Sequence, residues 1–155
     1  MRRGVQENWT IRRATDADSG AIKCFHQLLN RPQRSDSIAS EYFLAERTGN
    51  IVGCAAVRTQ GPLGYLYGLA VTKSCRRGGI GHALTSRRLD WLRETEAESA
   101  FVLAMFWNIG FFRQHGFELA NSHLKRDLQS LHQDFIEKWS IRSVLLVADL
   151  RRPKP

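Results

Sequence analysis

Residues 64–81, GYLYGLAVTKSCRRGGIG, pass from an apolar strand through a basic, glycine-rich loop into a helix. Glycines let the backbone approach a phosphate closely, and the N–H groups that begin a helix carry about half a positive charge toward an anion. Arg76 and Arg77 add charge beside them. The loop is not a Walker A loop, because His82 stands where a lysine is required, and its glycine spacing does not fit the dinucleotide fingerprint. The sequence therefore predicts a pyrophosphate site here, with a plain flexible loop as the alternative.

The residues before this stretch predict a strand, a helix and a hairpin. Alternation predicts a strand over 9–13, and Thr15 is the expected N-cap of a helix that ends near 30–32. Strand-like runs at 42–47 and 51–58 flank a short turn, which is typical of a β-hairpin.

The residues after the loop predict further alternation of strands and helices. We expect a buried strand of the parallel type over 100–105, a short aromatic helix over 106–115, a polar helix over 128–138 and a last strand over 143–150. Trp91 and Trp107 are expected in the core. The fold class is therefore α/β (mixed α+β), with antiparallel and parallel pairs in one sheet and one domain over residues 1–155.

Composition sets broader limits on function. The 155 residues are 43% hydrophobic and 25% charged, which excludes disorder throughout and a small disulfide scaffold. The net charge of +8 favours anionic partners, but it is spread along the chain. Three cysteines lack metal-ligand spacing, and neither a signal peptide nor a membrane span is recognisable in the sequence. We expect a cytoplasmic protein without a metal or a membrane partner.

Two motifs resemble the GNAT superfamily of acetyl-CoA-dependent N-acetyltransferases. Leu69-Ala70-Val71 followed by Arg76, Gly79 and Gly81 resembles the strand and loop of that family, and residues 111–117, FFRQHGF, resemble the end of a later helix. The resemblance implies a mixed sheet that is splayed in a V, with helices on both faces and acetyl-CoA as cosubstrate. It also implies transfer of an acetyl group to a primary amine.

The resemblance further implies which residues contact acetyl-CoA. Backbone groups of the strand would hold the pantetheine and the thioester, those of the loop would hold the pyrophosphate, and two later residues complete the set. The residues are Leu69, Ala70, Val71, Arg76, Arg77, Gly78, Gly79, Ile80, Gly81, Asn108 and Phe112.

A narrower resemblance is to the acetyltransferase domain of bacterial N-acetylglutamate synthase, carried by residues 51–56 and 141–150. It implies that Arg34, Ser35, Arg142 and Ser143 bind the acceptor, since arginine pairs with carboxylates in a bidentate manner. An amino acid or a similar small carboxylate-bearing amine is then the expected substrate. Val144 departs from the family pattern, which has a lysine after the Arg-Ser pair.

The proton transfers are less completely specified by the sequence. Many family members place a tyrosine acid where this chain has Phe112, and a glutamate where it has Tyr67. A thiol with a pKa of about 8.5 leaves tolerably well without a proton. Tyr67, orienting a water, and His115, acting through a water, are the candidate catalytic residues.

Three alternatives stay open. One is a protein N-terminal or lysine acetyltransferase, and another is a protein that binds CoA without turnover. The third is a basic nucleic-acid-associated module, which is not the expected outcome because aromatic and basic residues do not interleave in the sequence. The oligomeric state is expected to be a monomer or a homodimer.

Overall fold

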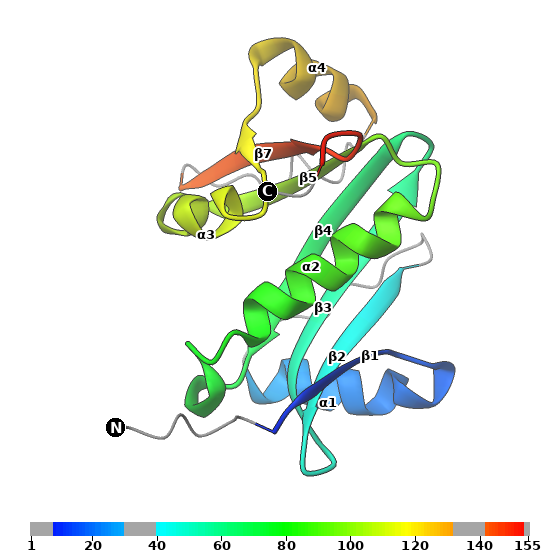
Figure 1. Cartoon of the computed structure of the whole chain (residues 1–155), viewed down its shortest axis with the longest axis vertical. Coiled ribbons are helices and arrows are strands. Elements are labelled where there is room, and N and C mark those ends of the chain that lie inside the picture. Colours follow the sequence, from blue (N-terminus) through cyan, green and yellow to red (C-terminus); the bar gives the residue numbers. More distant parts are fainter. Residues whose placement is uncertain (1–7, 30–39, 132–141, 154–155) are drawn as a thin grey trace. The chain divides into compact units, whose positions relative to one another are not determined.

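A computed structural model describes residues 8–29, 40–131 and 142–153 of the chain. The strands are β1 (Thr10–Arg13), β2 (Glu41–Arg47), β3 (Asn50–Gln60), β4 (Leu63–Val71), β5 (Ser99–Met105), β6 (Glu118–Leu119) and β7 (Ser143–Asp149) (Figure 1). The helices are α1 (Ser19–Leu28), α2 (Ile80–Arg93), α3 (Ile109–Arg113) and α4 (Ser122–Leu131). In the described residues, no helix is long and apolar enough to cross a membrane.

The strands are hydrogen-bonded in the order β1-β2-β3-β4-β5-β7-β6. β2 pairs with β3 in antiparallel fashion, β4 pairs with β5 in parallel through Leu63–Leu66 and Ser99–Val102, and β7 is antiparallel to β5. The predicted mixed α/β sheet is confirmed. By its contacts the chain divides into two compact units, residues 1–58 with 68–90 and residues 59–67 with 91–155.

One helix begins earlier than predicted, and one strand was not predicted. Helix α4 begins at Ser122 and not near residue 128, because the Asn121 side chain caps it by accepting a hydrogen bond of 2.8 Å from the backbone N–H of Leu124. The short strand β6 was not expected, since two residues carry too little periodicity to predict a strand.

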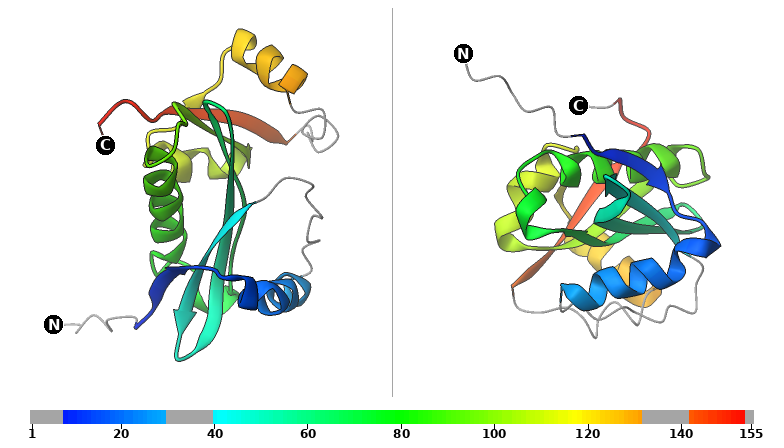
Figure 2. Two further views of the ribbon diagram at one scale, coloured as in Figure 1. Left: turned by 90° about the vertical axis from the view of Figure 1, so that its right-hand side faces the viewer. Right: turned by 90° about the horizontal axis from the view of Figure 1, so that it is seen from below.

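In the first unit, helices cover both faces of the strands. Gly53 on β3 lies against Ile80 and Leu84 of α2, so closely that a Cβ on Gly53 would come within 2.9 Å of Ile80. Its neighbour Cys54 packs with Ile22 of α1. Because successive strand residues point to opposite faces, α1 and α2 cover opposite faces, as Figure 2 shows.

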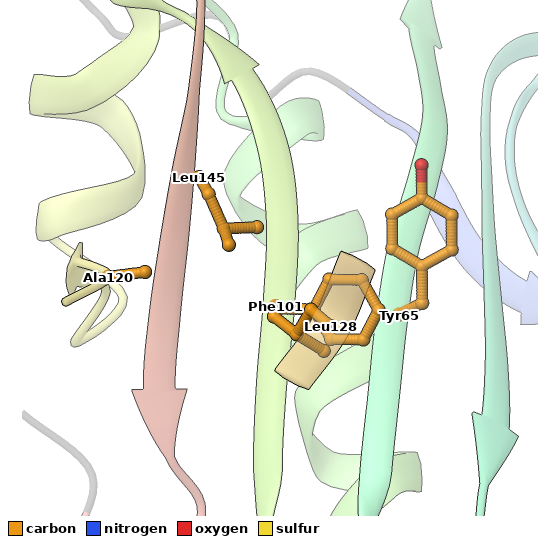
Figure 3. Close-up of a cluster of buried hydrophobic side chains, with 5 residues drawn as sticks. All are labelled: Tyr65, Phe101, Ala120, Leu128 and Leu145. Carbon is orange, nitrogen blue, oxygen red and sulfur yellow. The ribbon is translucent and has the colours of Figure 1, made fainter. Parts of the chain in front are cut away.

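The second unit has a separate apolar core. Tyr65 of β4, Phe101 of β5 and Leu145 of β7 gather on one face of the sheet, and Leu128 of α4 packs against them (Figure 3). The rings of Tyr65 and Phe101 stack with 4.8 Å between their centroids. On the other face, Gly64 lies against Leu92 at the end of α2, where a Cβ would clash.

A charged network ties the start of the first helical segment to the sheet. Arg12 of β1 donates two hydrogen bonds to the Asp18 carboxylate, at 2.7 and 2.8 Å, and one to Glu46 of β2 at 2.8 Å. Asp18 also accepts a hydrogen bond of 2.7 Å from the backbone N–H of Thr15, as in a helix N-terminal cap. These hydrogen bonds hold the pKa of Asp18 well below its ordinary value.

We therefore expect stability to depend on pH through Asp18. In the unfolded chain the Asp18 carboxyl titrates near pH 4. As the solution is acidified, this carboxylate is therefore protonated in the unfolded chain before it is protonated in the folded chain. The stabilisation is present above that pH and is lost as the pH falls below it. Asp18→Asn should lower the melting temperature at pH 7 and flatten its fall between about pH 5 and 3, followed by circular dichroism. Asp16→Asn in the same turn is the control, and equal pH profiles for the two variants would contradict the assignment.

Candidate active site

The predicted phosphate loop lies in the first unit, between the end of β4 and the start of α2. A 3₁₀ turn, Lys73–Cys75, follows the strand, and the Arg76 Nε donates a hydrogen bond of 3.0 Å back to the Val71 carbonyl. Arg77 and Gly79 adopt left-handed conformations, with φ of 66° and 84°. Alternation of left-handed and ordinary residues turns successive N–H groups toward one point, forming an anion-binding nest.

Burial keeps the start of α2 in place while the loop stays accessible. The Ile80 side chain is buried against β3, whereas Arg76, Arg77 and Gly79 are exposed. The N–H groups in the first turn of a helix have no partner within the helix and favour an anion. The loop therefore suits a pyrophosphate, which is the group that CoA would present to it.

The strand residues that precede the loop also belong to the first unit. Ala70 is buried with Phe25 of α1, and Leu69 and Val71 are half-buried on either side of it. Gly68 has a φ of 65° within β4, a conformation that glycine adopts without strain. A left-handed glycine inside a strand is typical of a β-bulge, and it re-aims the backbone of the residues that follow. Gly68 was not predicted as a site residue, although a glycine inside an apolar strand is the signal that could have found it.

The remaining described candidates all lie in the second unit. The Tyr67 ring stacks on Tyr65, with 5.2 Å between the centroids and 16° between the planes. Asn108 is exposed at the start of α3, and the His115 ring lies 5.5 Å from that of Phe111. Phe112 is buried, 6% exposed, with its ring against Phe111 and Phe117. Its side chain has no hydroxyl and cannot donate a proton.

The proposed acceptor residues are described only in part. The Arg142 carbonyl accepts a hydrogen bond of 3.0 Å from the Phe106 N–H, and the Arg142 side chain is exposed. The Ser143 hydroxyl lies 3.9 Å from the sulfur of Met105. Arg34 and Ser35 lie outside the described residues. The structure thus groups the loop and strand residues in one unit and Tyr67, Asn108, Phe112, His115, Arg142 and Ser143 in the other.

One expectation about the core is wrong. Trp107 is 58% exposed and Phe106 is 57% exposed, with their rings in an edge-to-face pair 5.0 Å apart. Both residues follow the last residue of β5 in a 3₁₀ turn, where the chain has left the sheet that would have buried them. Apolar character alone predicted burial, and it carries no information about where a strand ends.

A buried arginine was also missed. Arg88 on α2 is 1% exposed, and its guanidinium donates to the Ala56 carbonyl at 3.1 Å and to the Thr85 hydroxyl at 3.2 Å. Burial lowers the pKa of Arg88 to about 9, although the nearby Cys54 raises it in part. A pocket in the second unit is lined by Arg113 and residues 116–119, none of which is a predicted site residue.

Within the described residues, no cluster of three or more histidine, cysteine or carboxylate side chains could hold a metal ion.

Sequence comparison matches the chain to a known protein family. A model of the acetyltransferase (GNAT) family matches residues 7–117. An amino-acid acetyltransferase from Mycobacterium tuberculosis is 35% identical over 81 residues, which are 50% of this chain and 45% of that protein.

Solved structures share the fold. N-acetylglutamate synthase from Neisseria gonorrhoeae, complexed with coenzyme A and N-acetyl-glutamate, matches with a TM-score of 0.73 at 26% identity, over 93% of this chain and 35% of that one. The ribosomal-protein-S18-alanine N-acetyltransferase from Escherichia coli matches with a TM-score of 0.65 at 14% identity, over 94% and 96% of the two chains. The chain thus spans less than half the length of the mycobacterial protein and of the synthase.

Proposed function

The chain belongs to the acetyltransferase (GNAT) family, and from this premise we propose that it transfers the acetyl group of acetyl-CoA to the primary amine of an amino acid or a similar small carboxylate-bearing amine. The observation that carries the proposal is the loop at Arg76–Gly81. There, left-handed backbone at Arg77 and Gly79 and two exposed arginines meet the start of a helix. The names of the mycobacterial relative and of the synthase support an amino acid as the acceptor.

We assign the parts of acetyl-CoA to the residues that suit them chemically. The pyrophosphate fits the N–H groups of residues 77–81, and Arg76 and Arg77 add positive charge beside it. The backbone of Leu69–Val71 offers N–H and C=O groups to the pantetheine amides and one N–H to the thioester oxygen. Asn108, whose side chain is exposed, is a further polar contact for the pantetheine arm.

The reaction requires little general acid–base catalysis from the protein. The neutral amine nitrogen attacks the thioester carbonyl carbon, a C–N bond forms, and the C–S bond breaks to release a thiolate. One proton of the amine passes to water. A thiol with a pKa of about 8.5 is a tolerable leaving group, which fits a chain with the apolar, buried Phe112.

We propose that Tyr67 orients a water molecule in the reaction and that His115 acts on the reacting groups through a water molecule. Tyr67 carries a hydroxyl on a ring held by stacking, and His115 has a half-buried ring beside Phe111. We expect Tyr67→Phe and His115→Gln each to lower kcat measurably, by up to about 10-fold, because general acid–base catalysis contributes roughly 10²–10⁴-fold when one group carries it alone. The measurement is initial rates at saturating acetyl-CoA. An unchanged kcat removes the residue from the mechanism, and a loss of 10³-fold would show a dedicated acid or base.

Two assays with the purified chain test the proposed function. Calorimetry should show saturable binding of acetyl-CoA, and a thiol-release screen against the twenty amino acids, polyamines and short peptides should show turnover with at least one amino acid. Turnover with peptides alone would instead support a protein acetyltransferase. Binding without any turnover would support a CoA-binding protein that lacks transferase activity.

We place the protein in the cytoplasm, and its cysteines support this. Cys24, Cys54 and Cys75 are all free thiols, the state that a reducing compartment maintains.

The exposed Cys24 and the buried Cys54 should differ sharply in reactivity. Burial raises the pKa of Cys54 to about 12, so about one thiol in 10,000 is ionised at pH 8, and only the thiolate reacts. We expect a chromogenic disulfide reagent to modify the exposed Cys24 within minutes and to reach Cys54 only when the chain is unfolded. Cys24→Ser is the matched control, since it should remove the fast phase. A fast phase that disappears in Cys54→Ser would contradict the assignment.

A further inference from the structure

A tryptophan from the start of the first unit lies beside the phosphate loop of the same unit. A Cβ added to Gly79 would come within 3.9 Å of the Cζ2 atom of the Trp9 indole, which is ordinary van der Waals contact. Trp9 directly precedes β1 and is half-buried, whereas Gly79 is exposed. The indole therefore flanks one side of a loop whose residues are otherwise accessible.

The sheet fixes the position of this indole relative to the loop. Thr10, the residue after Trp9, pairs with Glu46 of β2, so the chain is held in the sheet from that point on. The same sheet also holds the start of α2, because Gly53 of β3 lies against the buried Ile80. Trp9 and the first residue of α2 thus rest on one scaffold.

The loop between these anchors has a backbone that needs support. Arg77 and Gly79 both adopt left-handed conformations, and Arg77 does so although it carries a Cβ. Such a conformation costs a residue with a Cβ about 1–2 kcal/mol. Backbone of this kind persists where the surrounding structure holds it in place. Trp9 is a bulky, rigid neighbour at the Gly79 end of the loop.

We propose that Trp9 is a positioning residue for the pyrophosphate of CoA, because its indole keeps the Gly79 end of the loop in the conformation that aims the N–H groups at one point. The proposal rests on the proposed function and adds a residue to the same site. A site that already has its binding conformation binds more tightly, since the ligand has less of the chain to order. The indole carries no charge, so its effect on the phosphates passes through the loop.

Truncation of the indole tests the proposal. Trp9→Ala should weaken the binding of CoA by about 3- to 10-fold in isothermal titration calorimetry, the loss expected when one loop must be ordered on binding. The KM for acetyl-CoA should rise by a similar factor and kcat should stay within about 2-fold, because the acyl transfer itself is untouched. Trp9→Phe keeps an aromatic ring beside Gly79 and should restore at least about half of the lost binding free energy.

The outcomes separate this inference from the proposed function. An unchanged affinity in Trp9→Ala overturns the inference and leaves the proposed function standing. Absence of CoA binding by the unaltered chain overturns both.

A second tryptophan supplies the matched control for folding. Trp91 is also half-buried, but it lies in the last turn of α2, at the far end of that helix from the loop. Trp91→Ala should lower the melting temperature and keep its affinity for CoA. An equal loss of affinity in Trp91→Ala would assign the effect to general destabilisation and would overturn the inference.

A double variant shows whether Trp9 acts through the backbone at Gly79. Once Gly79→Ala has disturbed the loop, removal of the indole should matter little. The double variant should therefore bind CoA no more than about 2-fold more weakly than Gly79→Ala alone. Two losses that simply multiply would show independent effects and would overturn the positioning role.

A truncated ligand distinguishes the loop from a direct contact with the adenosine half of CoA. 4′-Phosphopantetheine carries the pantetheine phosphate but no adenosine. Used as a competitive inhibitor against acetyl-CoA, it should lose affinity for Trp9→Ala by the same factor as CoA does. A loss that is seen with CoA and is absent with 4′-phosphopantetheine would place Trp9 against the adenosine and would overturn the positioning role.

Discussion

Arg88→Ala is expected to lower the free energy of unfolding by about 2–4 kcal/mol, as the truncation of other large buried side chains does. The side chain is fully buried between α2 and β3, so its removal leaves a cavity that the surrounding elements cannot fill. It also deletes the donors to the Ala56 carbonyl and the Thr85 hydroxyl. Urea unfolding followed by circular dichroism measures the loss.

Two companion variants make this expectation specific. Arg88→Met keeps most of the side-chain volume. It should recover at least about half of the lost stability, because the methionine side chain fills the cavity and needs no hydrogen-bond partner of its own. The neighbouring Arg87→Ala should change stability by about 1 kcal/mol or less, since Arg87 is exposed and its guanidinium makes a ring contact 5.8 Å from the centroid of Phe43. Equal losses for Arg87→Ala and Arg88→Ala would contradict the assignment of Arg88 to the interior.

Gly79→Ala should weaken the binding of CoA and acetyl-CoA by about 5- to 30-fold. Gly79 has a φ of 84°, and the left-handed region costs a residue with a Cβ about 1–2 kcal/mol. Space is not the obstacle, because the nearest atom to an added Cβ, on Trp9, is 3.9 Å away. The loss therefore arises from the backbone conformation that aims the N–H groups. Isothermal titration calorimetry with CoA measures it.

Gly61→Ala provides the same backbone strain at a different place. Gly61 has a φ of 56° in the turn between β3 and β4, and an added Cβ meets nothing within 4 Å. Gly61→Ala should lose about as much stability as Gly79→Ala, but it should keep its affinity for CoA. If Gly61→Ala weakened CoA binding as much as Gly79→Ala, general destabilisation and not loop geometry would be the cause.

The loop was predictable because its evidence is local. Glycines, paired arginines and the helix that follows are adjacent in the chain, and each has a direct consequence for backbone conformation. The hairpin of β2 and β3 was predictable for the same reason, since strand alternation and a Gly-Asn turn stand side by side.

Burial was harder to predict because it depends on what covers a residue. Trp107 is apolar but follows the end of β5, and Arg88 is charged but lies on the face of α2 between Leu84 and Leu92. The spacing of four between these residues placed Arg88 on the sheet-facing stripe, so a signal was present in the sequence. Arginine is usually exposed in proteins, and this expectation was given more weight than the helical spacing of the three residues.

The β2–β3 pair and the β4–β5 pair also differ in the chain entropy that is lost when each pair forms. In the hairpin of the first unit, Arg47 pairs with Asn50, three positions later, through a turn with left-handed Thr48 and Gly49. In the second unit, Tyr65 pairs with Phe101, 36 positions later, because a parallel pair needs a crossover connection. Since loop-closure entropy grows with the logarithm of loop length, the parallel pair costs about 2 kcal/mol more to close. The aromatic stack of Tyr65 on Phe101 lies within this parallel pair and contributes about 0.5–1.5 kcal/mol, beyond its buried area, against that cost.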